Sequence, residues 1–413
     1  MPPNEKSICQ ILPSFDGSSQ NDKQNSWYLS TILNATRFPD DKDYIHHDWT
    51  FTLLSEVLPF LLNDEESSEL VVNPDVQLRI EYFARMVVQR IQTHLHSNYF
   101  QKKKPPPPIK IAVVGGSIPE GRECIIQSSK IKIPSGSIMS NPTYCAWPYR
   151  LESFLNSFLG LEVVKVVNLA EEGTDLGFAT RLFQHRLLPS FLWNNNVEDG
   201  ERNGFDLVIV AYETREIMFG ETANDGGSSS SEEKEVARKQ QLNKFVNAVD
   251  GLSCATPPPL IIHLDDLPTV VGGNTHEENV IATATKQKKR KQQQVLGGDN
   301  ILSVRYADIV NRVLKTDDDT SFGMEGHVVM TWIVAHALAD ITSQYCSSYQ
   351  KDGTSAIKIQ QMLNENKLNA CSSNENKKES PCTFAWFASP KGAGTLSKPI
   401  ELNQYILPHI IEN

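Results

Sequence analysis

The chain has 413 residues, of which 39% are hydrophobic and 22% are charged, and its formal net charge at pH 7 is −11. This length allows one large or two ordinary domains, and the negative charge argues against general attraction to nucleic acid or to an anionic membrane. No apolar stretch reaches the roughly 18 to 20 residues of a membrane helix, so we expect no transmembrane segment. The N-terminus also lacks the pattern of a secretory signal, and the compartment stays open.

The N-terminal part of the sequence predicts helices followed by a linker. Residues 1–25 are polar and are expected to be disordered. The region 26–101 is predicted to be helical, because Asn73-Pro74-Asp75 combines a capping residue, a proline at the first helical position and an acid in the first turn. Apolar residues then recur at helical spacing, and a second helix is expected at 51–62. Residues 102–108, KKKPPPP, predict an extended linker.

From residue 109 to 345 the pattern predicts an α/β domain. Near-continuous apolar runs that are typical of buried strands occur at 109–114, 163–167, 207–210 and 260–263. Amphipathic helical patterns lie between them, which indicates a parallel sheet covered by helices on both faces. Ligands bind such sheets beyond the carboxyl ends of the strands.

Two insertions, a last helix and a C-terminal extension complete the predicted organisation. Polar surface loops are expected at about 220–233 and 272–298. The last helix is expected at about 323–342. A polar segment and the C-terminal extension occupy 346–413.

The seven cysteines are too few for a disulfide scaffold in a chain of this length, and none forms a CxxC zinc pair. Two loop-placed pairs, Cys124 with Cys145 and Cys371 with Cys382, are candidates for disulfide bonds in an oxidising compartment. In a reducing compartment they would be plain thiols. The sequence leaves both alternatives open.

The first candidate site follows the first predicted strand, at Gly115-Gly116-Ser117. Glycines at a strand end allow a sharp turn that leaves the next side chain exposed above the sheet. A serine hydroxyl there lies where backbone N–H groups favour developing negative charge. A plain turn and a phosphate-binding loop are the alternatives, although the lysine of the G-x-x-x-x-G-K-[ST] pattern is absent.

A second glycine-containing turn follows the second predicted strand, in the block 167–175, VNLAEEGTD. Gly173 permits backbone N–H groups to face a bound anion. A simple strand-to-helix turn also explains this block, and taken alone the block favours that simpler interpretation.

Together these segments resemble the SGNH (GDSL) hydrolase superfamily, in the branch whose Gly-Asp-Ser becomes Gly-Gly-Ser. The resemblance lies in IAVVGGSIPEGREC, CAWPYRLESFL, VVNLAEEGTDLG, FDLVIVAYETRE and SFGMEGHVVMTW, in that order over about 109–345. It implies a doubly wound, flavodoxin-like parallel sheet with helices on both faces. It also implies serine ester-hydrolase chemistry that uses no cofactor and no metal.

The resemblance implies a nucleophile and three oxyanion donors. Ser117 matches the nucleophile, whose backbone N–H is also a donor, and Gly173 matches the second donor. The third donor is normally an Asn, where this chain has Arg215, and Ala211 stands where the family has Glu. Loss of one oxyanion donor costs roughly 10²–10³ in rate, although Arg215 can still donate hydrogen bonds.

The family's catalytic base is a His near the end of the domain, preceded by an acid. Ser321 stands at the position of that His. His327 matches a later His that is usually not catalytic, about 9 Å further along a helix. In an active enzyme His327 would have to act as the base, with Asp318 as its acid, and His263 is a second candidate base.

Two functions are consistent with these residues. The first is a serine esterase or acyl hydrolase acting on an O-acyl ester of a small molecule or a glycan. The second is a catalytically inactive SGNH-fold protein that binds an anionic ligand or a partner through Arg215. An imidazole within about 3 Å of Ser117 Oγ would favour the first. Phosphate or nucleotide binding at Gly115-Gly116 is a third and weaker alternative.

Overall fold

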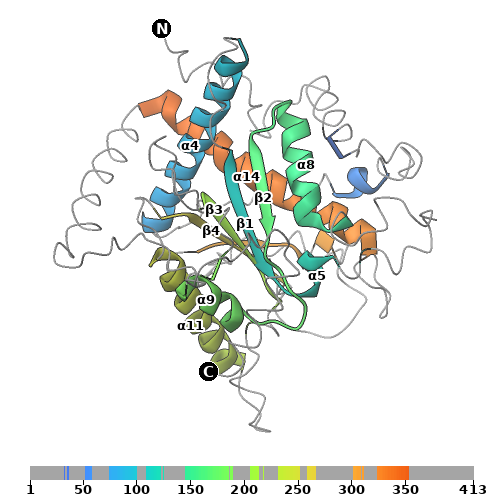
Figure 1. Cartoon of the computed structure of the whole chain (residues 1–413), viewed down its shortest axis with the longest axis vertical. Coiled ribbons are helices and arrows are strands. Elements are labelled where there is room, and N and C mark those ends of the chain that lie inside the picture. The colour runs from blue at the N-terminus through green and yellow to red at the C-terminus, as the bar shows by residue number, and fades with distance from the viewer. Residues whose placement is uncertain are drawn as a thin grey trace, which may run out of the picture.

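The computed structural model describes a core of the chain. The described residues are 32, 35–36, 52–57, 74–99, 108–121, 124, 145–185, 187–188, 205–213, 217, 231–251, 258–266, 301–307, 309–310 and 323–352. They form a five-stranded parallel sheet with helices packed against it (Figure 1). The parallel α/β architecture predicted from the alternating apolar runs is confirmed. Within this part of the chain, no helix is long and apolar enough to cross a membrane.

The sheet has the strand order β2-β1-β3-β4-β5, and every neighbouring pair is parallel. The strands are β1 Ile109–Gly115, β2 Val164–Asn168, β3 Leu207–Ala211, β4 Leu260–Asp265 and β5 Leu302–Arg305. The register pairs Gly115 with Ala211 and Val113 with Asn168. The carboxyl ends of β1, β2 and β3 therefore meet at one edge of the sheet.

The place of each strand in the sheet explains its composition. The inner strands β3 and β4 are buried along nearly their whole length, as strands covered on both faces must be. The edge strand β2 buries Val164 but exposes Lys165. The other edge strand, β5, was not predicted, because its four residues, LSVR, are too few and too polar to give a strand pattern.

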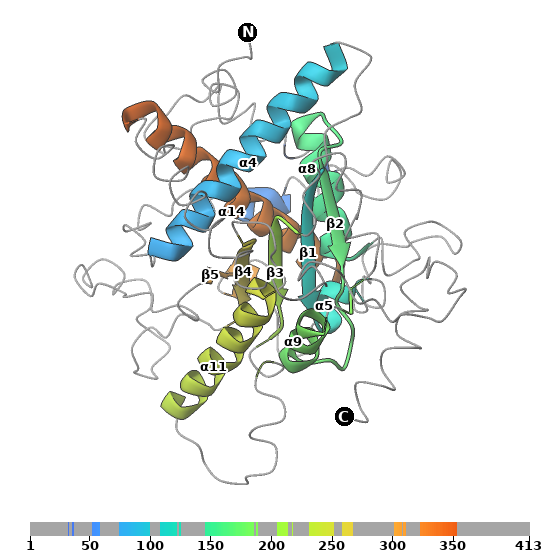
Figure 2. The ribbon, with the colours of Figure 1, turned by 60° about the vertical axis from the view of Figure 1, so that its left-hand side comes forward.

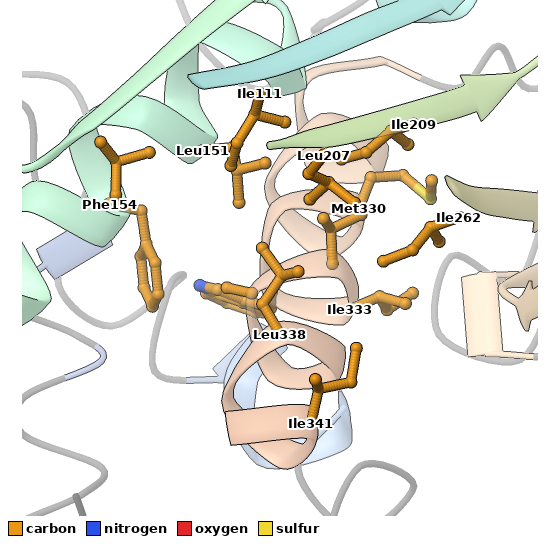
Figure 3. Packing of buried hydrophobic residues seen from close by; sticks show 14 of the residues in the cluster. Ile111, Leu151, Phe154, Leu207, Ile209, Ile262, Met330, Ile333, Leu338 and Ile341 are labelled. Carbon is orange, nitrogen blue, oxygen red and sulfur yellow. The ribbon is translucent and has the colours of Figure 1, made fainter. Parts of the chain in front are cut away.

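Alternate strand residues face two separate hydrophobic clusters. On one face, Ile111, Leu207 and Ile209 pack with α4 Pro74–Tyr99, α8 Trp147–Leu159 and α14 Gly323–Asp352. On the other face, Ala112, Val208 and Val210 pack with α9 Leu176–Gln184 and α11 Ser231–Asp250. Figure 3 shows strand residues of the first cluster, among them Ile111 and Ile209, beside Met330 and Ile333 of α14. The sheet is thus covered on both sides.

The helix α4 packs on the sheet domain and crosses α14 (Figure 2). It begins at Pro74, where the proline and acid predicted a start. Two arginines of α4 form ion pairs with the domain: Arg79 with Asp250 at 2.8 Å, and Arg90 with Asp206. Asp206 also accepts a hydrogen bond from the backbone N–H of Lys110 at 2.8 Å. These contacts join α4 to the start of β1 and to the loop before β3.

Some predicted boundaries differ from the observed ones. Helix α14 continues to Asp352, beyond its expected end near residue 342. Helix α11 begins at Ser231, so residues 231–233 of the expected loop are helical. Residues 52–57 are helical, within the helix expected at 51–62. The expected disordered N-terminus 1–25, linker residues 102–107, and segments 220–230, 272–298 and 353–413 lie outside the described residues.

Candidate functional site

Ser117 lies at the carboxyl end of β1, where it begins the short helix α5, Ser117–Glu120 (Figure 1). Its side chain is half-buried. The preceding Gly115 must be a glycine, because a Cβ there would lie 2.7 Å from the carbonyl oxygen of Ala211 and would overlap the ring of Pro119. The close approach of β1, β3 and α5 therefore sets the position of Ser117 beyond the sheet.

The turn that contains Gly173 lies beside this helix. The backbone N–H of Glu171 donates to the carbonyl oxygen of Gly115 at 3.0 Å. The N–H of Glu172 donates to Oε2 of Glu120 at 2.9 Å, and Nδ2 of Asn168 donates to the carbonyl oxygen of Pro119 at 2.7 Å. Three hydrogen bonds thus join the turn after β2 to the segment around Ser117. Two residues predicted for the site, Ser117 and Gly173, are brought to the same edge of the sheet.

Gly173 is exposed and has a φ of 73°, which is left-handed backbone that favours glycine. The turn is closed by Thr174, whose Oγ1 donates to the carbonyl oxygen of Glu171 at 2.6 Å. The same Oγ1 lies 3.2 Å from the hydroxyl oxygen of Tyr212 at the end of β3. Tyr212 is buried, with 1% of its surface exposed. It thereby holds the Gly173 turn against a third strand of the sheet.

His327 lies in the second turn of α14 and is fully buried. Its Nδ1 accepts a hydrogen bond from the backbone N–H of Trp147, the first residue of α8, at 3.2 Å. Burial, together with the positive charge of Arg150, lowers the pKa of His327 from 6.5 to about 3. The imidazole is therefore neutral at pH 7. Because Nδ1 accepts a hydrogen bond, the neutral ring carries its proton on Nε2.

A disulfide bond between Cys124 and Cys145 connects the segment after α5 to the segment before α8. The backbone N–H of Cys124 donates to the carbonyl oxygen of Gly121, the residue that caps the C-terminal end of α5. The carbonyl oxygen of Cys145 accepts a hydrogen bond from Nε of Arg150 at 2.9 Å. Both cysteines are fully buried. The disulfide alternative for this pair is thus the one found, and Cys371 with Cys382 lies outside the described residues.

Several residues predicted for the site are not placed by the structure. Arg215, Asp318 and Ser321 lie outside the described residues, so their parts in the site stay predictions. His263 lies inside β4 and is fully buried. Among the described residues, no group of three or more His, Cys, Asp or Glu side chains could hold a metal ion.

The sequence did not reveal the roles that Tyr212, Arg150 and the backbone N–H of Trp147 have around the site. Tyr212 directly follows an apolar strand. Its contact with Thr174 could not be predicted, because the two residues lie 38 positions apart and no sequence pattern links them. Arg150 lies in the segment CAWPYRLESFL that carries the family resemblance, but a buried arginine cannot be told from an exposed one in a helix pattern. The contact of Trp147 with His327 depends on how α8 packs against α14, which no sequence pattern shows.

The comparisons with known proteins give no identity. No protein-family model matches the chain, and no curated protein matches it. The function is therefore argued from the geometry above.

Proposed function

We propose that this chain is an SGNH/GDSL-like serine esterase or acyl hydrolase that acts on an O-acyl ester of a small molecule or a glycan. The observation that carries the proposal is that Ser117 and the Gly173 turn lie at the same carboxyl edge of the sheet. This edge is where parallel α/β sheets bind ligands. The order β2-β1-β3-β4-β5 supports the doubly wound, flavodoxin-like arrangement that the family resemblance implies.

In this proposal Ser117 Oγ attacks the carbonyl carbon of the ester and forms an acyl-enzyme, while the alcohol leaves with a proton. Water then attacks the acyl-enzyme, which releases the acid and restores the serine. The backbone N–H groups of Ser117 and Gly173 would hold the oxyanion. Arg215 would supply the third donor, with its fixed charge.

Ser117 Oγ must give its proton to a base when it attacks. We assign the role of base to His327, oriented by Asp318. The hydrogen bond from Trp147 bears directly on this step. While Nδ1 accepts that N–H, Nε2 carries a proton and cannot accept another. His327 can take the serine proton only after the bond to Trp147 is broken.

This observation favours a second candidate function, an SGNH-fold protein that binds an anionic ligand without turnover. Loss of general-base catalysis typically costs 10²–10⁴ in rate. A pocket that keeps Ser117, the Gly173 turn and Arg215 would still offer hydrogen-bond donors to a carboxylate or a sulfated sugar.

Labelling with a fluorophosphonate probe decides between the two functions. The purified wild type, Ser117→Ala and Ser157→Ala would be treated with the probe, and circular dichroism would verify that all three fold. Ser157 is a matched control, because it is exposed on α8. A hydrolase labels in the wild type and in Ser157→Ala but not in Ser117→Ala. A folded wild type without labelling would reject the hydrolase.

The binding function has its own readout. Calorimetry with acetate and with glucose 6-sulfate would be done on the wild type and on Arg215→Met. Binding of either anion that is lost in Arg215→Met supports the second candidate. Binding of neither anion by an unlabelled protein rejects both functions.

A further inference from the structure

The backbone at Gly173 is not fixed by packing around the glycine itself. Glu172 and Gly173 are exposed, and a Cβ built on Gly173 would meet no atom of the other described residues within 4 Å. The shape of the turn therefore depends on the hydrogen bonds on either side of Gly173. On the far side these bonds start at Thr174, whose hydroxyl lies between the turn and the end of β3.

The direction of the two hydrogen bonds at Thr174 follows from its chemistry. A hydroxyl has one hydrogen, and Thr174 donates it to the carbonyl oxygen of Glu171 at 2.6 Å. The hydroxyl oxygen of Tyr212 lies 3.2 Å from Oγ1 of Thr174, so Tyr212 must be the donor of this second bond. The ring of Tyr212 is buried in the cluster that α9 and α11 cover. The turn is thus tied to a side chain that the core holds in place.

The path of hydrogen bonds continues from the turn to the strand that precedes Ser117. The backbone N–H of Glu171 donates to the carbonyl oxygen of Gly115 at 3.0 Å. Gly115 lies two residues before Ser117 and is paired with Ala211 of β3. Tyr212 is the next residue after Ala211. The path that begins at Tyr212 therefore returns to β3 through the pairing of β1 and β3, and this closed path fixes the turn relative to β1.

We infer that Tyr212 is a positioning residue, whose hydroxyl holds the backbone N–H of Gly173 where it and the N–H of Ser117 can bind one oxyanion. This role rests on the proposed function, because acyl transfer is the reaction that develops negative charge between these two donors. Tyr212 itself is buried and does not touch the substrate. Its effect passes through the turn, because an oxyanion donor acts only at about 2.7–3.1 Å from the charged oxygen.

Four variants of the full chain isolate the hydroxyl contact. Tyr212→Phe removes the donor and keeps the buried ring. Thr174→Val removes the acceptor, whereas Thr174→Ser keeps it. Tyr149→Phe is the matched control, because it makes the same change at a tyrosine of α8 that is 39% exposed. Circular dichroism and urea unfolding would verify that every variant is folded under the assay conditions.

The rate of Ser117 labelling by the fluorophosphonate probe measures the effect on the site. Tyr212→Phe and Thr174→Val should each lower the maximal labelling rate by about tenfold, a part of the 10²–10³ that loss of a whole donor costs. The probe concentration that gives half of the maximal rate should stay the same, since the donors act on the transition state. Thr174→Ser and Tyr149→Phe should label as the wild type does.

The double variant Tyr212→Phe/Thr174→Val tests whether the two residues act through one bond. It should label no more slowly than either single variant, because each single change already removes that bond. A merely structural role would lower the stability of the variants but would leave the labelling rate of the folded protein unchanged.

Hydrogen–deuterium exchange separates the inference from the proposed function. Mass spectrometry of peptides that cover residues 169–175 should show about tenfold faster exchange in Tyr212→Phe than in the wild type or Tyr149→Phe. A wild type that is not labelled rejects the hydrolase, and faster exchange would then still support Tyr212 as the residue that holds the turn. Unchanged exchange in Tyr212→Phe would overturn the inference, as would a labelled wild type whose Tyr212→Phe variant labels equally fast.

Discussion

His327 accepts a hydrogen bond from the backbone N–H of Trp147, 180 residues away in the chain, at 3.2 Å. The first N–H groups of a helix have no partner within that helix. Helix α8 begins after Ala146, whose side chain provides no cap. The imidazole of His327 therefore caps α8 from another helix. This role explains why a histidine is fully buried in the apolar first turns of α14.

Replacing His327 by Leu should lower the free energy of unfolding by about 1–3 kcal/mol, because the N–H of Trp147 would be buried without an acceptor. Replacing it by Asn, which keeps an acceptor, should cost less. Urea unfolding followed by circular dichroism measures both variants. Equal stability of His327→Leu and the wild type would contradict the capping role.

The protein should lose stability as the pH falls from 6.5 towards 4. The pKa of His327 is lowered to about 3, by burial and by Arg150, and that of His336 to about 4, by burial. In the unfolded chain, each of these two histidines binds a proton near pH 6.5. In the folded chain, neither histidine binds a proton until the pH is much lower. Each histidine therefore contributes stability that is complete above pH 6.5 and falls by up to about 1.4 kcal/mol per pH unit below it.

Urea unfolding at a series of pH values measures this dependence. His336→Gln should flatten it, whereas His185→Gln, at an exposed position, should leave it unchanged. A slope that His336→Gln does not reduce would show that this histidine is protonated in the folded protein.

Gly115→Ala should displace the Ser117 segment. The added Cβ would lie 2.7 Å from the carbonyl oxygen of Ala211, and this backbone cannot retreat without breaking the pairing of β1 and β3. Overpacking of this kind costs about 1–3 kcal/mol. Gly177→Ala is the comparison, because its Cβ would meet a side-chain atom, Oδ1 of Asp175, at 3.3 Å and no backbone atom of another strand. Urea unfolding should separate the two variants, and similar stabilities would refute the close-approach argument.

Reduction of the Cys124–Cys145 disulfide should destabilise the protein by about 3 kcal/mol. The bond spans a sequence separation of 21 residues, and closing a loop of this size restricts the unfolded chain. Unfolding with and without dithiothreitol measures the effect. The double variant Cys124→Ala/Cys145→Ala should have the lower stability in both conditions. If the reductant also destabilised this double variant, the effect would not come from this bond.

Removing the carboxylate of Asp206 should cost about 3 kcal/mol. Asp206→Ala leaves the nearly buried Arg90 without its ion partner and the N–H of Lys110 without its acceptor. By contrast, Lys165→Met, which breaks the exposed pair with Glu152, should cost less than about 1 kcal/mol. Urea unfolding should rank the two in this order, and the reverse order would exclude Asp206 as an anchor for α4.

The parallel sheet could be predicted from the sequence because its inner strands are buried on both faces and leave long apolar runs. Glycines at 115 and at 173 could also be predicted to mark turns, because each follows a predicted strand, but the close approach of the Ala211 carbonyl oxygen that requires Gly115 could not. The contact between Trp147 and His327 could not, because it depends on where α14 lies relative to α8. The short edge strand β5 was missed for a related reason, since its pairing with β4 supplies what its composition lacks.

The position of α14 also has a consequence for the order in which the protein can fold during synthesis. Residues of α14, from Val328 to Ile341, supply a large part of the cluster that covers one face of β1, β3 and β4. This helix is the last described element of the chain, whereas α4 and β1 are among the first. The ribosome must therefore have synthesised the chain past Ile341 before α14 can complete the cover that α4 and α8 begin on this face. Until then the nascent sheet presents an apolar surface to which chaperones can bind.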